Sequence, residues 1–173
     1  MVLKNIILSV LLIAASASVF AAKDGTGPEI GKLVPLLNGT TSDGEPYRLK
    51  SDTGRTKVIN FFWVECHACR DEMPELAKLE KKFKDVKFIS VHTTLYEHAE
   101  EPESVGKFVK SLKGAPSNIV LTTSTALGND FNISVLPHTM ILDENNMVLM
   151  NIVGYNKNNM QKLSKALQKI TKQ

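Results

Sequence analysis

Cysteine is scarce in this sequence: the 173 residues contain only two, Cys66 and Cys69, separated by two residues. A closed structural zinc site takes four ligands, and the chain has no second cysteine pair to complete one. A covalent haem site needs a histidine directly after the second cysteine, where this chain has Arg70. A purely structural disulfide between these residues would close a very short loop, which gives little entropic stabilisation. These absences favour redox chemistry for the pair.

A strong excess of charge of either sign is also absent. The chain has 21 basic and 18 acidic side chains, for a formal net charge of +3. So small an excess gives no argument for binding nucleic acid or an anionic membrane. The sequence has no internal repeat and no low-complexity segment, and its length suits one domain with a sizeable core.

The longest apolar stretch lies at the N-terminus. Lys4 provides a short positive region, residues 6–13 are apolar, and Val19-Phe20-Ala21 fits the small-residue rule for signal cleavage. The stretch is shorter than the roughly 20 residues that a membrane span requires. We therefore expect residues 1–21 to be a cleaved signal peptide, with a periplasmic or otherwise extracytoplasmic mature chain that has no membrane span. A retained N-terminal anchor is the alternative.

After the leader, extended apolar runs alternate with stretches of helical periodicity. We expect residues 22–29 to be a flexible lead-in, and residues 30–173 to form one domain. The turn-rich segment 38–45, between extended segments 30–37 and 46–49, predicts an N-terminal β-hairpin. The alternation predicts an α/β sandwich with a central mixed sheet flanked by helices. Expected strands are 57–64, 86–91, 139–142 and 147–153, and expected helices are 72–84, 104–112 and 158–170; 118–121 is a short apolar run, and 125–131 is a helical turn or two.

The cysteine pair lies where a predicted strand gives way to a predicted helix. Cys66 should stand at or just before the helix start, where unpaired N–H groups and the helix dipole stabilise a thiolate, the attacking form of a thiol. Cys69 follows about one helical turn later and can resolve the mixed disulfide. Glu72, on the same helix face, is the nearest carboxylate in sequence that could carry protons for the pair. Asn60, inside the apolar strand, is interpreted as a hydrogen-bonded core amide.

Two sequence blocks resemble the thioredoxin fold, and within it the TlpA/ResA-like group of exported thiol–disulfide oxidoreductases. The first is Asn60-Phe61 with Cys66-x-x-Cys69-Arg70-x-Glu72-x-Pro74. The second is Val135-x-Pro137 followed by Met140-Ile141-Leu142-Asp143, which is similar to the family's cis-proline loop and the strand after it. The resemblance extends from Ile30 to the last helix.

The resemblance implies an exposed nucleophile at Cys66, a buried resolving thiol at Cys69 and an acidic residue near them at Glu72. Leu136 and Pro137 would present backbone groups to a bound extended polypeptide. Trp63 is counted with them as a candidate substrate-binding residue. The implied partners are a protein thiol or disulfide substrate and a membrane or envelope thiol donor, with no metal and no other cofactor. Family members commonly act as reductants, for example in cytochrome c maturation.

The sequence departs from the family around the first cysteine. Glu65 replaces the usual tryptophan and should raise the pKa of Cys66, whereas a protonated His67 would lower it. The direction of electron flow therefore stays open, and an oxidase or isomerase is one alternative. A peroxidase would need a threonine where this chain has Trp63. A copper carrier would use the cysteine pair with His138 as the third ligand.

Overall fold

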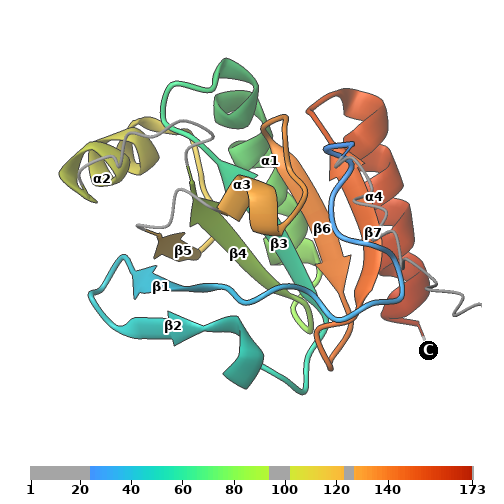
Figure 1. Ribbon diagram of the computed structural model, residues 1–173. Helices are drawn as coiled ribbons and strands as arrows, with labels where there is room; N and C mark the ends of the chain where they lie inside the picture. The colour runs from blue at the N-terminus through green and yellow to red at the C-terminus, as the bar shows by residue number, and fades with distance from the viewer. Residues whose placement is uncertain (1–23, 94–101, 123–126, 173) are drawn as a thin grey trace, which may run out of the picture.

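The computed structural model describes residues 24–93, 102–122 and 127–172; the expected signal peptide lies outside them. Helices and strands alternate along most of the chain (Figure 1). The strands are β1 (Asn38–Thr41), β2 (Pro46–Arg48), β3 (Lys57–Phe62), β4 (Lys87–His92), β5 (Asn118–Leu121), β6 (His138–Leu142) and β7 (Val148–Val153). The helices are α1 (His67–Lys82), α2 (Pro102–Ser111), α3 (Leu127–Asp130) and α4 (Lys157–Ile170), with a 3-10 turn at Leu49–Ser51.

The strands form one mixed sheet in the order β2-β1-β5-β4-β3-β6-β7. β3 lies inside the sheet, parallel to β4 and antiparallel to β6. All six of its residues are buried, as expected for a nearly continuous apolar run covered on both faces. The expected α/β sandwich of the thioredoxin type is confirmed.

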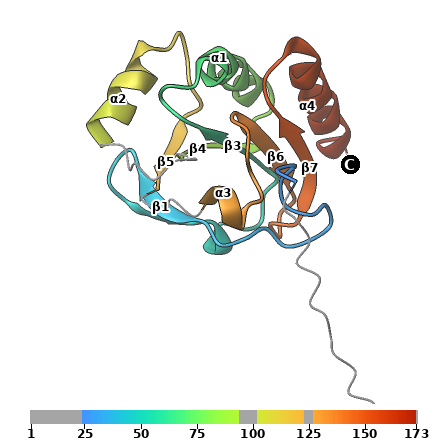
Figure 2. The ribbon, with the colours of Figure 1, turned by 45° about the horizontal axis from the view of Figure 1, so that its top comes forward.

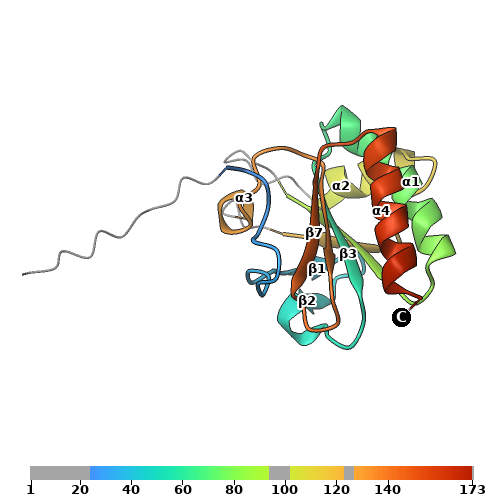
Figure 3. The same cartoon turned by 90° about the vertical axis from the view of Figure 1, so that its right-hand side faces the viewer.

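Helices cover the two faces of the sheet unequally. Seen along the sheet, α1 and α4 lie on one side, whereas α3 and residues 24–37 lie on the other (Figures 2 and 3). On the α1 side, Val58 and Phe62 of β3 pack into apolar clusters with residues of α1, α2 and α4. On the opposite side, Ile59 and Phe61 contribute to the cluster that also holds Leu127 of α3. Alternate residues of β3 therefore belong to different layers.

The expected N-terminal hairpin is present, but its first strand lies inside the segment predicted as turn. β1 pairs with β2, and the turn is confined to 42–45, where Gly44 has φ +89°. Gly39 is needed for a different reason, because a Cβ there would lie 2.5 Å from the carbonyl oxygen of Leu121. Only glycine lets β1 approach β5 this closely. The hairpin thus extends the main sheet.

Two further elements differ from what the apolar periodicity indicated. The periodicity indicated a helix from residue 72, whereas α1 begins at His67, directly after Cys66, as the predicted position of that cysteine at the helix start requires. Residues 118–121, read only as a short apolar run, form β5, which pairs in parallel with β4. Four residues are too few for a clear periodicity, so pairing with neighbours decides their structure. Within the described residues, no helix is both long and apolar enough to cross a bilayer.

Candidate active site

The first cysteine caps the helix that follows it. Cys66 has extended φ and ψ of −79° and 105°, and its Sγ accepts a hydrogen bond of 3.1 Å from the backbone N–H of Cys69. Its own backbone N–H donates to the carbonyl oxygen of Trp63 at 3.1 Å, closing a tight turn after β3. The sulfur therefore lies among the unpaired N–H groups of the helix start, where negative charge is stabilised.

Cys66 and Cys69 form a disulfide, with their Cα atoms 5.2 Å apart. The two residues differ in access: Cys66 is partly exposed, whereas Cys69 is 0% exposed. Cys69 packs in an apolar cluster with Phe62, Met73 and Phe108. Only Cys66 is accessible to another protein, so the arrangement suits attack by Cys66 and resolution by Cys69.

Glu72 lies one helical turn beyond Cys69 and is only 1% exposed. Asn60 Nδ2 donates to its Oε2 at 2.6 Å, and Thr139 Oγ1 donates to its Oε1 at 3.1 Å. Burial raises the pKa of the Glu72 carboxyl from 4.5 to about 7, while these two hydrogen bonds act in the opposite direction. A carboxyl group with this pKa exchanges protons readily near neutral pH.

Asn60 and Thr139 reach Glu72 because they face each other across β3 and β6. Asn60 Nδ2 also donates to Thr139 Oγ1 at 3.0 Å, so the three side chains form one buried network. The interpretation of Asn60 as a hydrogen-bonded core amide is confirmed. Thr139 was missed, since only the pairing of two strands distant in sequence brings it to Glu72. Its position two residues after Pro137 was the feature of the sequence that could have indicated a place near the site.

The network has unused hydrogen-bonding capacity. Ser90 of β4 lies beside Asn60 in the sheet. Among the described side chains, neither Asn60 Oδ1 nor Ser90 Oγ has a hydrogen-bond partner, although both atoms are buried. Buried polar atoms normally find a partner, including ordered water. The polar network around Glu72 therefore has a further buried polar side chain, Ser90, next to it on β4.

The loop before β6 reaches the same end of the sheet. The Leu136–Pro137 peptide bond is cis, as the resemblance implied. Pro137 is buried, and partly buried Leu136 packs against the apolar cluster that Cys66 also contacts. Trp63 is partly buried at the end of β3. All of the predicted site residues except Glu72, which lies one helical turn after Cys69 in α1, thus occur in the two segments that meet around Cys66.

The third ligand of a copper carrier is not at this site. His138 and Thr139 are consecutive in β6, so their side chains point to opposite faces of the sheet. Thr139 faces Glu72, whereas His138 Nε2 lies 3.4 Å from Asn151 Oδ1. In the part of the chain that the structure describes, no three His, Cys, Asp or Glu side chains are grouped for metal binding.

Comparisons with known proteins identify relatives among thiol-disulfide oxidoreductases and thioredoxin-like proteins. The Redoxin family model matches residues 21–170. A thiol-disulfide oxidoreductase ResA of Geobacillus kaustophilus is 28% identical over 158 residues, which cover 89% of this chain and 87% of that protein. The thioredoxin-like protein YneN of Bacillus subtilis is 27% identical over 128 residues, 73% of each chain.

A solved structure supports the fold independently. The thioredoxin domain of a thiol-disulfide oxidoreductase from Bacteroides vulgatus matches with a TM-score of 0.69 and 20% identity, covering 81% of this chain and 99% of that one. At this identity the likeness concerns the fold alone. Taken with the family match and the Cys66–Cys69 disulfide at the start of α1, it leads to one conclusion: the chain belongs to the Redoxin family, as a thioredoxin-fold thiol–disulfide oxidoreductase related to ResA.

Proposed function

We propose that this protein is an exported reductant of protein disulfides. Cys66 is the attacking sulfur, Cys69 is the resolving sulfur, and Glu72 carries the proton of Cys69. The observation that carries the proposal is the buried Glu72 carboxyl, whose pKa of about 7 suits proton transfer near neutral pH. It lies one helical turn from the buried cysteine.

The reaction begins with the reduced protein. The Cys66 thiolate attacks one sulfur of the substrate disulfide, the S–S bond breaks, and the released substrate sulfur takes up a proton. Cys69 then gives its proton to Glu72 and attacks Cys66 Sγ. The mixed S–S bond breaks, and the second substrate sulfur leaves as a thiolate that takes up a proton from solvent, to which Glu72 later releases its own. The substrate has gained two electrons and two protons, and the protein holds the Cys66–Cys69 disulfide. An external thiol donor returns the protein to its dithiol form.

Glu72 assists the second step of the reaction, whereas the direction of electron flow depends on the reduction potential. Burial in apolar surroundings raises the pKa of a thiol, and Cys69 is fully buried beside Phe62 and Met73. Such a thiol needs a base before it can attack the mixed disulfide. Glu72 is a suitable base because its own burial brings its pKa into the working range.

Substrate binding is proposed for the segments around Cys66. Leu136 and Pro137 would offer backbone groups to an extended polypeptide, and Trp63, directly after β3, would add an aromatic contact. Val135 is exposed and adds apolar surface to this loop.

The cellular role follows from the resemblance together with the leader. Export through residues 1–21 would place the protein outside the cytoplasm, where disulfides persist and a reductant must be recharged by a membrane or envelope thiol donor. Apocytochrome thiols, or the carriers that reduce them, are the example of a substrate that the resemblance provides.

The direction of electron flow is tested by the reduction potential, measured by equilibration with glutathione. A reductant should lie near the thioredoxin value of about −270 mV, and a value near −120 mV would contradict the proposal. Substrates are tested in the native organism with Cys69→Ala, which should hold them as mixed disulfides on Cys66. Cys66→Ala is the matched control, and equal trapping by both variants would exclude Cys66 as the attacker.

A further inference from the structure

Two glycines near the N-terminus lie where no side chain fits. Gly25 and Gly27 are buried, with φ of +73° and +98°. A Cβ on Gly27 would lie 2.5 Å from Asn151 Oδ1 and 2.6 Å from His138 Nε2. A Cβ on Gly25 would collide with the Ser134 hydroxyl. The segment formed by residues 24–28, here named the strap, therefore packs with its backbone directly against β6, β7 and the loop before β6. It is not the free lead-in expected from the sequence.

Asn132 joins the strap to the loop. Its Nδ2 donates to Asp24 Oδ1 at 2.8 Å and to the carbonyl oxygen of Gly27 at 3.1 Å, and its Oδ1 accepts from the backbone N–H of Gly25 at 3.1 Å. The backbone N–H of Gly27 donates to the Asn132 carbonyl at 2.9 Å. Asn132 itself has φ +52°, a conformation that asparagine tolerates better than most residues.

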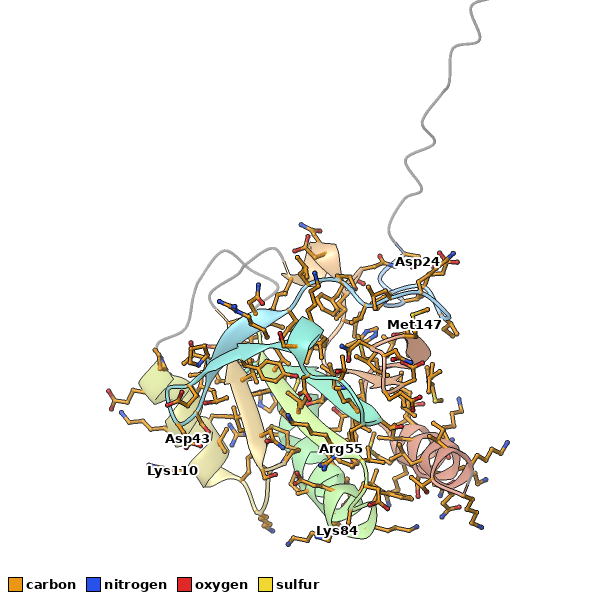
Figure 4. The ribbon with its side chains drawn as sticks, turned by 90° about the horizontal axis from the view of Figure 1, so that it is seen from below. Asp24, Asp43, Arg55, Lys84, Lys110 and Met147 are labelled. Atoms are coloured by element: carbon orange, nitrogen blue, oxygen red, sulfur yellow. A yellow bond between two sulfur atoms is a disulfide. The ribbon has the colours of Figure 1, made fainter. Side chains whose placement is uncertain are left out.

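The strap also contacts the strand that follows the loop. Asn151 Nδ2 donates to the carbonyl oxygen of Pro28 at 2.7 Å, while Asn151 Oδ1 lies 3.4 Å from His138 Nε2. His138 is fully buried and directly follows Pro137. The strap therefore reaches the loop 132–138 at both ends, directly at Asn132 and through Asn151 at His138. Asp24, at the start of the strap, is labelled in Figure 4.

We propose that Gly27 and Asn132 are positioning residues for polypeptide binding: they clamp the strap to the loop 132–138 and so hold Leu136 and Pro137 ready for the substrate. This inference rests on the proposed function, which assigns substrate contact to that loop. A loop ordered before binding loses less conformational entropy when the substrate arrives. Loosening the clamp should therefore weaken substrate binding more than it slows the chemistry.

The strap is separate from the sulfur chemistry. It packs on the face of the sheet that His138 occupies, whereas Thr139 and Glu72 lie on the other face. A small disulfide reagent needs only Cys66 and no ordered loop. Loosening the strap should therefore affect the reaction with a polypeptide disulfide and leave the reaction with a small disulfide unchanged.

The test is Gly27→Ala in the full chain, with Gly31→Ala as the matched control. Gly31 also has a positive φ, of +79°, but a Cβ there would meet nothing within 4 Å. The substrate is a disulfide-bonded peptide, with dithiothreitol as the electron donor. Gly27→Ala should raise KM for the peptide about tenfold with little change in kcat. The rate with 5,5′-dithiobis(2-nitrobenzoate) and the reduction potential should stay unchanged, and Gly31→Ala should resemble the wild type.

A second variant keeps the test decisive if Gly27→Ala does not fold. Asn132→Gly preserves access to the left-handed backbone but removes the side-chain hydrogen bonds to the strap. Asn132→Gly should also raise KM for the peptide and leave the rate with the small reagent unchanged. Unchanged KM in Asn132→Gly, or equal losses with the peptide and the small reagent, would overturn the inference while leaving the proposed function intact. A wild-type protein that reduces no peptide disulfide would overturn the proposed function, and the inference with it.

Discussion

Two carboxyl groups at opposite ends of the sheet have contrasting surroundings. At the carboxyl end of β3, Glu72 is buried and accepts hydrogen bonds from the neutral side chains of Asn60 and Thr139. Near the amino end, Asp52 accepts from the Tyr47 hydroxyl at 2.9 Å and pairs with Lys87, whose Nζ lies 2.7 Å from Asp52 Oδ2. Figure 4 views the molecule from this second end, where Arg55 and Lys84 add further positive charge.

The contrast distinguishes a carboxylate with a structural role, Asp52, from one that is a candidate for proton transfer, Glu72. Asp52 has a cation and a hydroxyl, so its charge is compensated where it lies, and it ties the N-terminal hairpin to β4. Glu72 has no cation among its hydrogen-bond partners, and burial keeps its pKa high. Carboxyl groups kept in such unfavourable surroundings are candidates for function rather than stability.

The largest expected effect is on catalysis. Glu72→Gln should slow reduction of a protein disulfide about 100-fold at neutral pH, because Cys69 loses its base while the size and hydrogen bonds of the side chain are largely kept. Asp52→Asn, the matched change at the other end, should leave the rate unchanged. Stopped-flow measurement of the second exchange step distinguishes the two. Equal rates for Glu72→Gln and the wild type would show that Glu72, like Asp52, takes no part in the exchange step.

The next effect concerns the pH dependence of stability. The folded-state pKa of Glu72, about 7, exceeds the ordinary value of 4.5, so the folded oxidised protein binds more protons than the unfolded chain between these pH values. Its contribution to stability is complete below about pH 4.5 and is lost as pH rises to about 7, a difference of up to about 3 kcal/mol. Glu72→Gln should remove this loss. Urea unfolding of the two proteins between pH 4.5 and 7 measures the free energy of unfolding. Parallel plots of this free energy against pH would contradict the prediction.

A smaller effect is expected for Asp52→Asn. The change leaves the Lys87 ammonium without its anion, and we expect a loss of about 1 kcal/mol of unfolding free energy. The Asp52 and Lys87 side chains are 17% and 28% exposed, so solvent screens their interaction in part. The exposed pair of Glu75 with Lys78 is the control, and Glu75→Gln should lower stability by a few tenths of a kcal/mol. Equal losses in both variants would mean that burial does not distinguish the two pairs.

The smallest effect is a shift in a pH profile. The hydrogen bond from Thr139 lowers the pKa of Glu72, against the larger effect of burial. Thr139→Val keeps the side-chain shape and removes this donor, so the pKa of Glu72 should rise further. The pH midpoint of the second exchange step should move upward with it. A midpoint that moves downward or stays in place would show that Glu72 does not control this step.

Much of the site could be predicted because its chemistry is local in sequence. Cys66, Cys69 and Glu72 lie within seven consecutive residues, and their helical spacing already places them on one side of α1. The fold class was predictable for a similar reason, since β3 and β4 are short apolar runs and α4 has a clear apolar periodicity. The hairpin strand β1 and the short β5 were not, because their pairing with each other and with β4 decides their structure.

The polar support of the site and the strap could not be predicted from local patterns. Thr139 reaches Glu72 from 67 residues away, and Asn132 reaches Asp24 from 108 residues away. Glycines 25 and 27 suggested flexibility, whereas the structure uses them for close packing against His138 and Ser134. A glycine has the same sequence signature in both roles, and only the neighbouring chain shows which one applies.

The sequence by itself determined the reactive pair, the helix that begins beside it and the alternation that gives an α/β sandwich, because short-range spacing and periodicity specify these features. The tertiary structure decided which cysteine is buried, how far the pKa of Glu72 rises, and which residues hold the loop of Leu136 and Pro137. Each of these depends on removal from water or on a partner distant in the chain, and burial and long-range contacts exist only once the sheet and its helices have packed.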